Sequence, residues 1–151
     1  MLRQQLNDSL KIALKARQKL AVSTIRLILA ALKDRDIAAR TKGLEDGISD
    51  SDILQLLNTM IRQRRESIQL YKSGGREDLA EREDEEISVI KKFLPPQIEG
   101  EEMIEAIRGV IKEIGASGIK DMGRTMAALK DNFAGQMDFG KASRVVRDLL
   151  A

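Results

Sequence analysis

Apolar residues recur at three- and four-residue spacing along most of the chain, which is the period of helices that bury one face. The first stripe begins at Leu2 and predicts a helix that ends near Lys19. A second helix is expected from about residues 22–24, with Ser23 or Thr24 as its N-cap, to about residue 40. The segment 43–50 contains two glycines and three acids, so we expect a loop there.

Two longer helices are predicted before the only prolines of the chain. Capping residues at 49–52 favour the start of a third helix, which the two glycines at 74 and 75 end. A fourth helix is expected from about Arg76 to Leu94, because Pro95 and Pro96 cannot continue it. We therefore place a domain boundary at the prolines, between an N-terminal helical domain, 1–94, and a C-terminal domain, 97–151.

Three shorter helices are predicted beyond the prolines, at about 102–114, 121–133 and 138–150. Helices of this length cannot bury their apolar faces alone, so we expect a compact three-helix bundle. Aromatic residues make up only 3% of the chain and there is no Trp, whereas residues that favour helices dominate. The predicted fold is all-α, with an N-terminal arm or bundle of about four helices followed by the small bundle.

Composition excludes several classes of chemistry. The chain has no Cys and no His, which removes thiolate nucleophiles, the commonest general base and the usual metal ligands. Ser117 and Lys120 are the nearest approach to a Ser-Lys amidase pair, but the surrounding Gly/Ser-rich pattern is missing. We expect no catalytic residue, no metal and no cofactor. No apolar run is long enough to span a membrane, so we expect a cytoplasmic protein and no membrane partner.

The segment 120–123 lies where a loop is predicted to become a helix. Unpaired backbone N–H groups and the helix dipole attract phosphate at such a place. Lys120, Arg124 and Lys130 supply cations, and Gly123 would let an RNA backbone approach closely. The alternative is structural: Asp121 caps the helix, and Gly123 permits tight packing against a neighbouring helix.

The last predicted helix carries Lys141, Arg144 and Arg147 at three-residue spacing, beside Asp138 as a candidate N-cap. A row of cations suits phosphate binding, but solvated helix faces carry such rows as often. Residues 97–151 hold eight Lys/Arg and nine Asp/Glu, a net charge of −1, so an RNA surface here would be one-sided. The RNA site predicted from these two motifs together requires the cations near the two helix starts to converge into one patch.

Charge is most asymmetric in the N-terminal part. Residues 1–42 contain ten Lys/Arg against three Asp, a net charge of +7, whereas the fourth helix has seven carboxylates between Glu77 and Glu86. The basic helices could hold RNA phosphates, with Arg62, Arg64 and Arg65 extending the surface. Alternatively, the basic and acidic helices neutralise each other across their rims, each exposed pair contributing under about 1 kcal/mol.

The C-terminal motifs carry a family resemblance. The sequence Lys-Asp-Met-Gly at 120–123, Gly-Lys at 140–141 and the ending Val-Val-Arg-Asp-Leu-Leu resemble the GatB/YqeY family, and the chain is similar to its free-standing YqeY type. The related tail domain of the aminoacyl-tRNA amidotransferase B subunit contacts tRNA, so the resemblance implies a tRNA-binding accessory protein. Its candidate RNA-binding residues are Lys120, Gly123, Arg124, Lys130, Lys141, Arg144 and Arg147.

Two other functions stay open at this point. The first is a helical protein-protein adaptor, whose partner would be an amidotransferase or another protein. The second is a carbon-nitrogen ligase with glutamine as amido-N-donor, which the resemblance suggests. We expect no such catalysis from this chain alone, because the kinase and glutaminase sites of amidotransferase systems belong to parts that it does not resemble.

Overall fold

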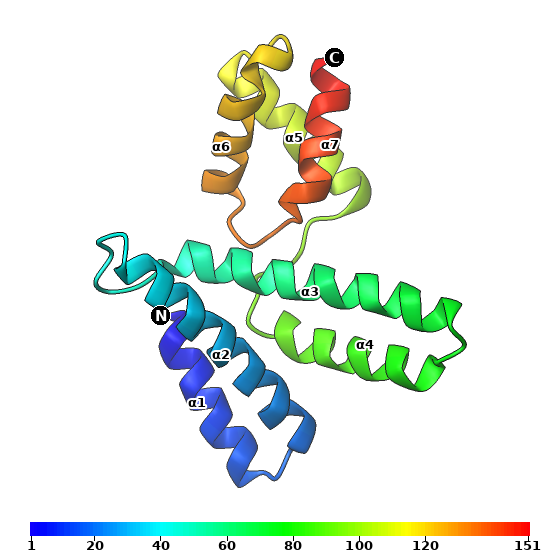
Figure 1. Ribbon diagram of the computed structural model, residues 1–151. Coiled ribbons are helices and arrows are strands. Elements are labelled where there is room, and N and C mark those ends of the chain that lie inside the picture. Colours follow the sequence, from blue (N-terminus) through cyan, green and yellow to red (C-terminus); the bar gives the residue numbers. More distant parts are fainter. The chain divides into compact units, whose positions relative to one another are not determined.

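The computed structural model describes residues 1–151 and contains seven α-helices, one short 3-10 helix and no strand (Figure 1), which confirms the all-α class. The chain divides between Pro95 and Pro96 into two compact units, Met1–Pro95 and Pro96–Ala151. Each unit has its own buried core.

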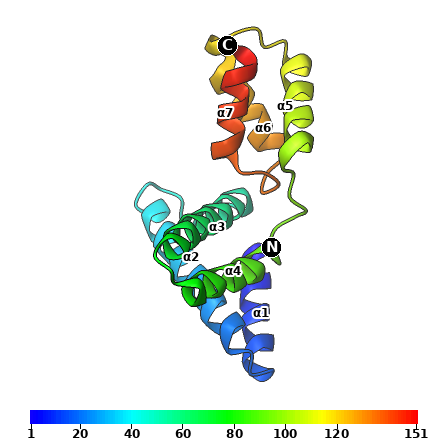
Figure 2. The ribbon, with the colours of Figure 1, turned by 90° about the vertical axis from the view of Figure 1, so that its right-hand side faces the viewer.

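Unit 1 consists of α1 (Leu2–Lys15), α2 (Lys19–Arg40), α3 (Asp50–Ser73) and α4 (Glu77–Lys91). α1 and α2 form one antiparallel hairpin, and α3 and α4 form a second (Figures 1 and 2). The predicted apolar stripes face inward, and their central side chains are completely or almost completely buried: Leu6, Ile28, Ile53, Leu57 and Ile90. Burial of these stripes is what stabilises the unit, since each aliphatic side chain contributes about 1.5–3 kcal/mol when removed from water.

The α1–α2 turn differs from the prediction. α1 ends at Lys15, and α2 begins at Lys19, so Ser23 and Thr24 lie inside α2 and neither is its N-cap. Arg17 adopts the left-handed conformation with φ 56°, and its N–H donates to the Leu14 carbonyl at 3.2 Å. No glycine or proline marks this turn, which is why the hydrophobic period alone misplaced it by several residues.

The start and end of α3 follow the predicted signals. The Ser49 hydroxyl accepts a hydrogen bond from the Asp52 N–H at 3.2 Å, which satisfies one of the free donors of the first turn. The helix ends at Ser73, and Gly75 follows with φ 73°, a conformation that glycine adopts without steric cost. Polar capping residues and glycines were therefore reliable guides where they occurred.

Unit 2 consists of α5 (Gly100–Ile114), the 3-10 helix η1 (Ile119–Asp121), α6 (Met122–Asn132) and α7 (Phe139–Leu150). The three α-helices pack against one another around Ile107, Leu129 and Val146. Met137, in the loop between α6 and α7, is also completely buried, although no periodic pattern singles it out. α6 and α7 run antiparallel (Figures 1 and 2).

Candidate nucleic-acid interface

The solvent face of α7 carries the predicted cation row. Lys141, Arg144 and Arg147 are exposed and make no ion pair, while Ala142, Val146 and Leu150 bury the opposite face. At 100° per residue, Asp148 falls between Lys141 and Arg144 on the outward side. The face therefore presents three cations and one carboxylate.

The N-terminus of α7 is already capped. Asp138 Oδ1 accepts hydrogen bonds from the N–H groups of Gly140 at 2.9 Å and Lys141 at 3.4 Å, as the sequence predicted. A carboxylate thus occupies the position that a phosphate would take at this helix start. Binding to α7 must rely on its side chains.

Asp121 does not cap α6, contrary to the structural alternative from the sequence. Its carboxylate accepts a hydrogen bond from the Ser117 N–H at 2.9 Å and pairs with Arg124 at 3.2 Å. The Ser117 hydrogen bond is the main reason that the pKa of Asp121 lies below its usual value, and Arg124 lowers it further. Arg124 also donates to the Ile114 carbonyl at 2.8 Å, so its guanidinium ties the end of α5 to the start of α6.

Gly123 is exposed in the first turn of α6. A Cβ placed on it would have no neighbouring atom within 4 Å, so the proposed packing against another helix is wrong. Open space beside this backbone is compatible with a close approach by a ligand, but it is equally present in a plain solvated helix.

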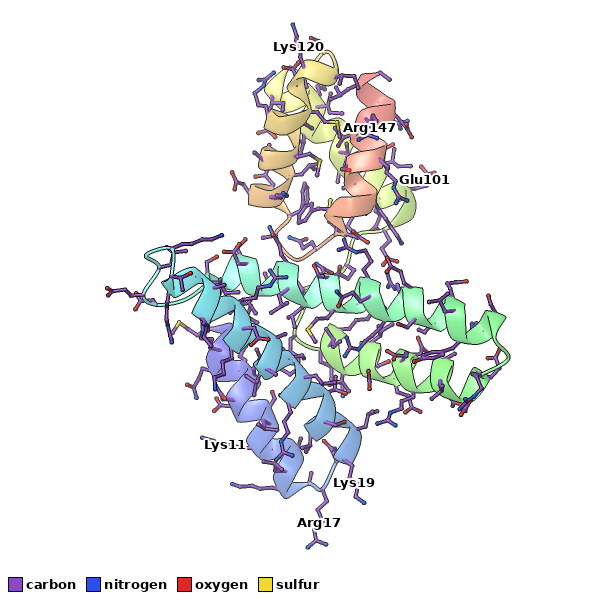
Figure 3. The ribbon with its side chains drawn as sticks, viewed as in Figure 1. Lys11, Arg17, Lys19, Glu101, Lys120 and Arg147 are labelled. Carbon is purple, nitrogen blue, oxygen red and sulfur yellow. The ribbon has the colours of Figure 1, made fainter.

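The seven predicted residues fall into separate groups. Lys120, Gly123 and Arg124 lie at the start of α6, whereas Lys130 lies near its end, with α6 spanning about 16 Å. Because α7 runs antiparallel to α6, the first turns of α7 lie at the end of the bundle where Lys130 lies. Lys141 and Arg144 are in these turns. Lys120 marks the other end, and Arg147 lies toward it along α7 (Figure 3). The two helix starts are therefore not adjacent, and their cations do not form one patch. The single RNA site predicted from both motifs is wrong, and the row on α7 is a separate, smaller candidate.

A second set of cations lies in unit 1, on the α1–α2 hairpin. No acid occurs between Asp8 and Asp34, and all six cations of that stretch are exposed and make no ion pair: Lys11, Lys15, Arg17, Lys19, Arg26 and Lys33. The sequence showed the charge asymmetry, but its net count included cations that the fold neutralises, such as Arg3 on Asp36. The long stretch without acidic residues would have identified these unpaired cations more directly than the net charge did.

Two carboxylates of α4, Glu83 and Glu86, are neutralised by α3 and not by the basic hairpin. Arg64 Nε donates to Glu86 Oε2 at 3.0 Å and lies 3.9 Å from Glu83 Oε2, and both Arg64 and Glu86 are largely buried. Although α2 packs against α4, no ion pair joins them. Burial raises the pKa of Glu83, and the neighbouring Glu86 raises it further, against the opposing effect of Arg64.

Other kinds of site find no support in the side-chain arrangement. No group of three or more potential metal-ligating residues is present. No helix has the length and apolar character required to cross a membrane.

A match over residues 3–150 to the family described as Yqey-like protein covers almost the entire chain. The chain belongs to the YqeY family. Its predicted resemblance to free-standing YqeY proteins is thereby confirmed, and the match includes both structural units.

Three similar proteins from fungi illustrate the likeness. The chain is 36% identical over 89 residues to "Altered inheritance of mitochondria protein 41, mitochondrial" of Lachancea thermotolerans, covering 59% of this chain and 46% of that protein. The protein of the same name in Clavispora lusitaniae is 27% identical over 148 residues, covering 96% and 82%. An uncharacterized Schizosaccharomyces pombe protein is 32% identical over 95 residues, covering 63% and 70%.

The first of these relatives is matched over less than half of its length, and its name places it in mitochondria. The expected cytoplasmic location of the present chain stays a prediction. None of the three names states a reaction, a ligand or a binding partner.

Proposed function

We propose that this YqeY protein binds structured RNA, with tRNA as the first class to test, and acts as an accessory protein without catalysis of its own. The observation that carries the proposal is the solvent face of α7, where Lys141, Arg144 and Arg147 have no carboxylate partner within ion-pair distance. Cations of this kind bind phosphates and release counterions, which favours binding at low salt.

The arrangement suits phosphate contacts better than base recognition. Tyr71 and three Phe residues are the only aromatics of the chain. Phe93, Phe133 and Phe139 are partly buried against the two cores, so no exposed aromatic row is available for stacking on unpaired bases. Binding would therefore depend on the shape and phosphates of a folded RNA.

Within the predicted residue set, the α7 group is the better candidate. Arg124 is already bound by Asp121 and the Ile114 carbonyl, so its charge is partly neutralised. Lys120 and Lys130 are exposed at opposite ends of α6 and contribute as single charges. We assign the main contact to Lys141 and Arg144, with Arg147 and Lys130 at its edges.

The test is a titration of a mixed tRNA pool at two salt concentrations with the native protein and the double variant Lys141→Glu, Arg144→Glu. We expect the variant to bind about 10- to 100-fold more weakly, with a salt slope reduced by about two, because each cation represents about one phosphate contact. Arg108→Glu with Lys112→Glu on α5 makes the same charge change in the same unit and should have a much smaller effect. Equal losses in both double variants would leave only a nonspecific charge effect and overturn the proposal.

A second candidate is a protein adaptor, which one feature of unit 1 favours. A groove of about 580 Å³ lies between α1, the start of α2 and the end of α4, with Ile12, Ile25, Val89 and Phe93 in its lining. Ile12, which is 66% exposed, gives this groove an apolar side chain that a partner could cover. Absence of tRNA binding even at low salt would favour this function over RNA docking.

A further inference from the structure

The strongest unassigned feature is the turn end of the α1–α2 hairpin. Five cations gather there, and we call this group the hairpin end: Lys11 and Lys15 of α1, Arg17 of the turn, and Lys19 and Arg26 of α2. All are exposed, and none makes an ion pair. Like charges on one surface repel one another, so an external anion bound there would stabilise the protein.

The cations fan outward around the turn. Figure 3 shows Lys11, Arg17 and Lys19 extending away from the hairpin in different directions. α1 and α2 pack against each other, so the cations of the two helices are held at fixed positions relative to one another. The hairpin end is thus a convex, positively charged projection of unit 1.

A hollow of about 310 Å³ lies within this group. Arg17, Lys19 and Arg26 line it, together with the Ser23 hydroxyl and two aliphatic side chains, Leu14 and Val22. Ser23 Oγ donates its hydrogen to the Leu20 carbonyl at 3.0 Å, so the donors available to a phosphate in this hollow are those of the three cations. Three cations around one hollow with no carboxylate in its lining make a setting for a phosphate group.

Lys19 also borders carboxylates on its other side. It lines a second hollow with Asp78, Glu81, Arg82 and Glu85 of α4, where three carboxylates outnumber the one Arg of that helix, and no ion pair forms between these helices. An approaching polyanion is repelled from that side. A polyanion is therefore expected to bind on the side of Arg17 and Arg26, away from α4.

The shape of the hairpin end selects among polyanions. A flat anionic bilayer can contact only those cations that point toward it. A double-helical stem carries phosphates along both edges of a groove, so it can contact cations that point in different directions. Unpaired RNA needs aromatic stacking platforms, and the hairpin end contains none. In A-form RNA the phosphates are accessible while bases in the deep groove are not, which suits cations without base-reading side chains.

We propose that the hairpin end binds the phosphates along a groove of a double-helical RNA stem, as a contact separate from α7. The choice of RNA rests on the function proposed above, but the surface and its residues are independent of α7. Contact through several cations predicts steep salt dependence and little dependence on stem sequence.

The test uses the whole chain and three probes: an RNA stem-loop, an unpaired RNA of equal length, and vesicles containing anionic lipid. Arg17→Glu with Lys19→Glu should weaken stem-loop binding about 10- to 100-fold and reduce the salt slope by about two. Lys42→Glu with Lys72→Glu is the matched control, because both side chains are exposed, make no ion pair and lie away from the hairpin end. The control should change stem-loop affinity by less than about threefold, as expected for distant surface charges.

Three results would overturn the proposal. They are an unchanged stem-loop affinity in the Arg17/Lys19 variant, equal affinity for the unpaired RNA, and vesicle binding that is tighter than stem-loop binding and lost in the same variant. Loss of RNA binding in the α7 variant alone would refute this contact and keep the function proposed above. Loss of RNA binding in the hairpin variant alone would support this contact and refute the contact assigned to α7.

Arg17→Gly separates binding from folding. Arg17 occupies a left-handed conformation that glycine adopts more readily, so this variant should melt at the same or a higher temperature. It removes one cation from the hollow and should weaken stem-loop binding several-fold, with a salt slope lower by about one. A variant with native affinity would show that Arg17 makes no phosphate contact.

Discussion

Units 1 and 2 distribute their charges in different ways. In unit 1, the hairpin cations have no acid between Asp8 and Asp34, while Glu83 and Glu86 of α4 are held by Arg64 of another helix. In unit 2, the pairs Arg124–Asp121 and Arg108–Glu105 join residues three apart on the same stretch of chain. The stretch without acid leaves six cations free together on the hairpin, whereas three stay free together on α7.

The two units also bury separate cores. Leu57 belongs to the core of unit 1, and Leu129 belongs to that of unit 2, and both side chains are completely buried. A defect in one core should therefore be felt mainly in its own unit.

The largest expected effect is a test of this separation. Leu57→Ala and Leu129→Ala should each cost about 3–5 kcal/mol through lost burial and a residual cavity. Hydrogen exchange followed along the chain should show faster exchange within residues 1–95 for Leu57→Ala and within residues 96–151 for Leu129→Ala. Equal acceleration in both units for either variant would contradict independent cores.

The next effect separates a neutralised cation from a free one. Arg64→Met leaves the largely buried Glu86 and Glu83 with only the exposed Arg82 as a nearby cation, and should cost about 2–3 kcal/mol at pH 7. Arg26→Met removes an exposed cation without an ion pair and should change stability by less than about 0.5 kcal/mol. Urea unfolding of both variants measures the difference, and similar costs would refute the contrast.

The cost of Arg64→Met should depend on pH in a defined direction. Burial and Glu86 raise the pKa of Glu83 above its ordinary value, and removing Arg64 raises it further. A carboxyl whose pKa is raised on folding favours the folded state at low pH and loses that contribution as pH rises through the folded pKa. The cost should therefore be small near pH 4 and complete at pH 7.

The smallest effect concerns Gly123 in unit 2. Gly123→Ala adds a Cβ in open space on a helix and should stabilise the protein by about 0.5–1 kcal/mol. Gly109→Ala in α5 is the matched control, with the same open surroundings, and should stabilise similarly. If an RNA backbone approaches Gly123, tRNA affinity falls in the first variant only; equal affinities would show that the glycine has no binding role.

Much of the helical structure could be predicted from local signals. Ser49 and the glycine at 75 mark the two ends of α3, and Asp138 caps α7 as expected. The α1–α2 turn was misplaced, because Arg17 enters the left-handed region with no residue that announces it. The burial of Met137 was missed as well, since a loop residue has no period.

The candidate site could be predicted only in part. The exposed row on α7 follows from three-residue spacing alone. The role of Asp121 did not follow, because its carboxylate turns back to Ser117 and across to Arg124 instead of capping α6. When a side chain has several possible partners, the folded structure decides which of them is close enough to bond. A sequence pattern does not specify these distances.

The sequence by itself determined an all-helical protein of the YqeY family, since helix period, caps and family motifs are properties of neighbouring residues. Only the tertiary structure decided which cations are neutralised, because that depends on contacts such as Arg64 with Glu86 across two helices. It also decided that the starts of α6 and α7 lie at opposite ends, since antiparallel packing of connected helices separates them.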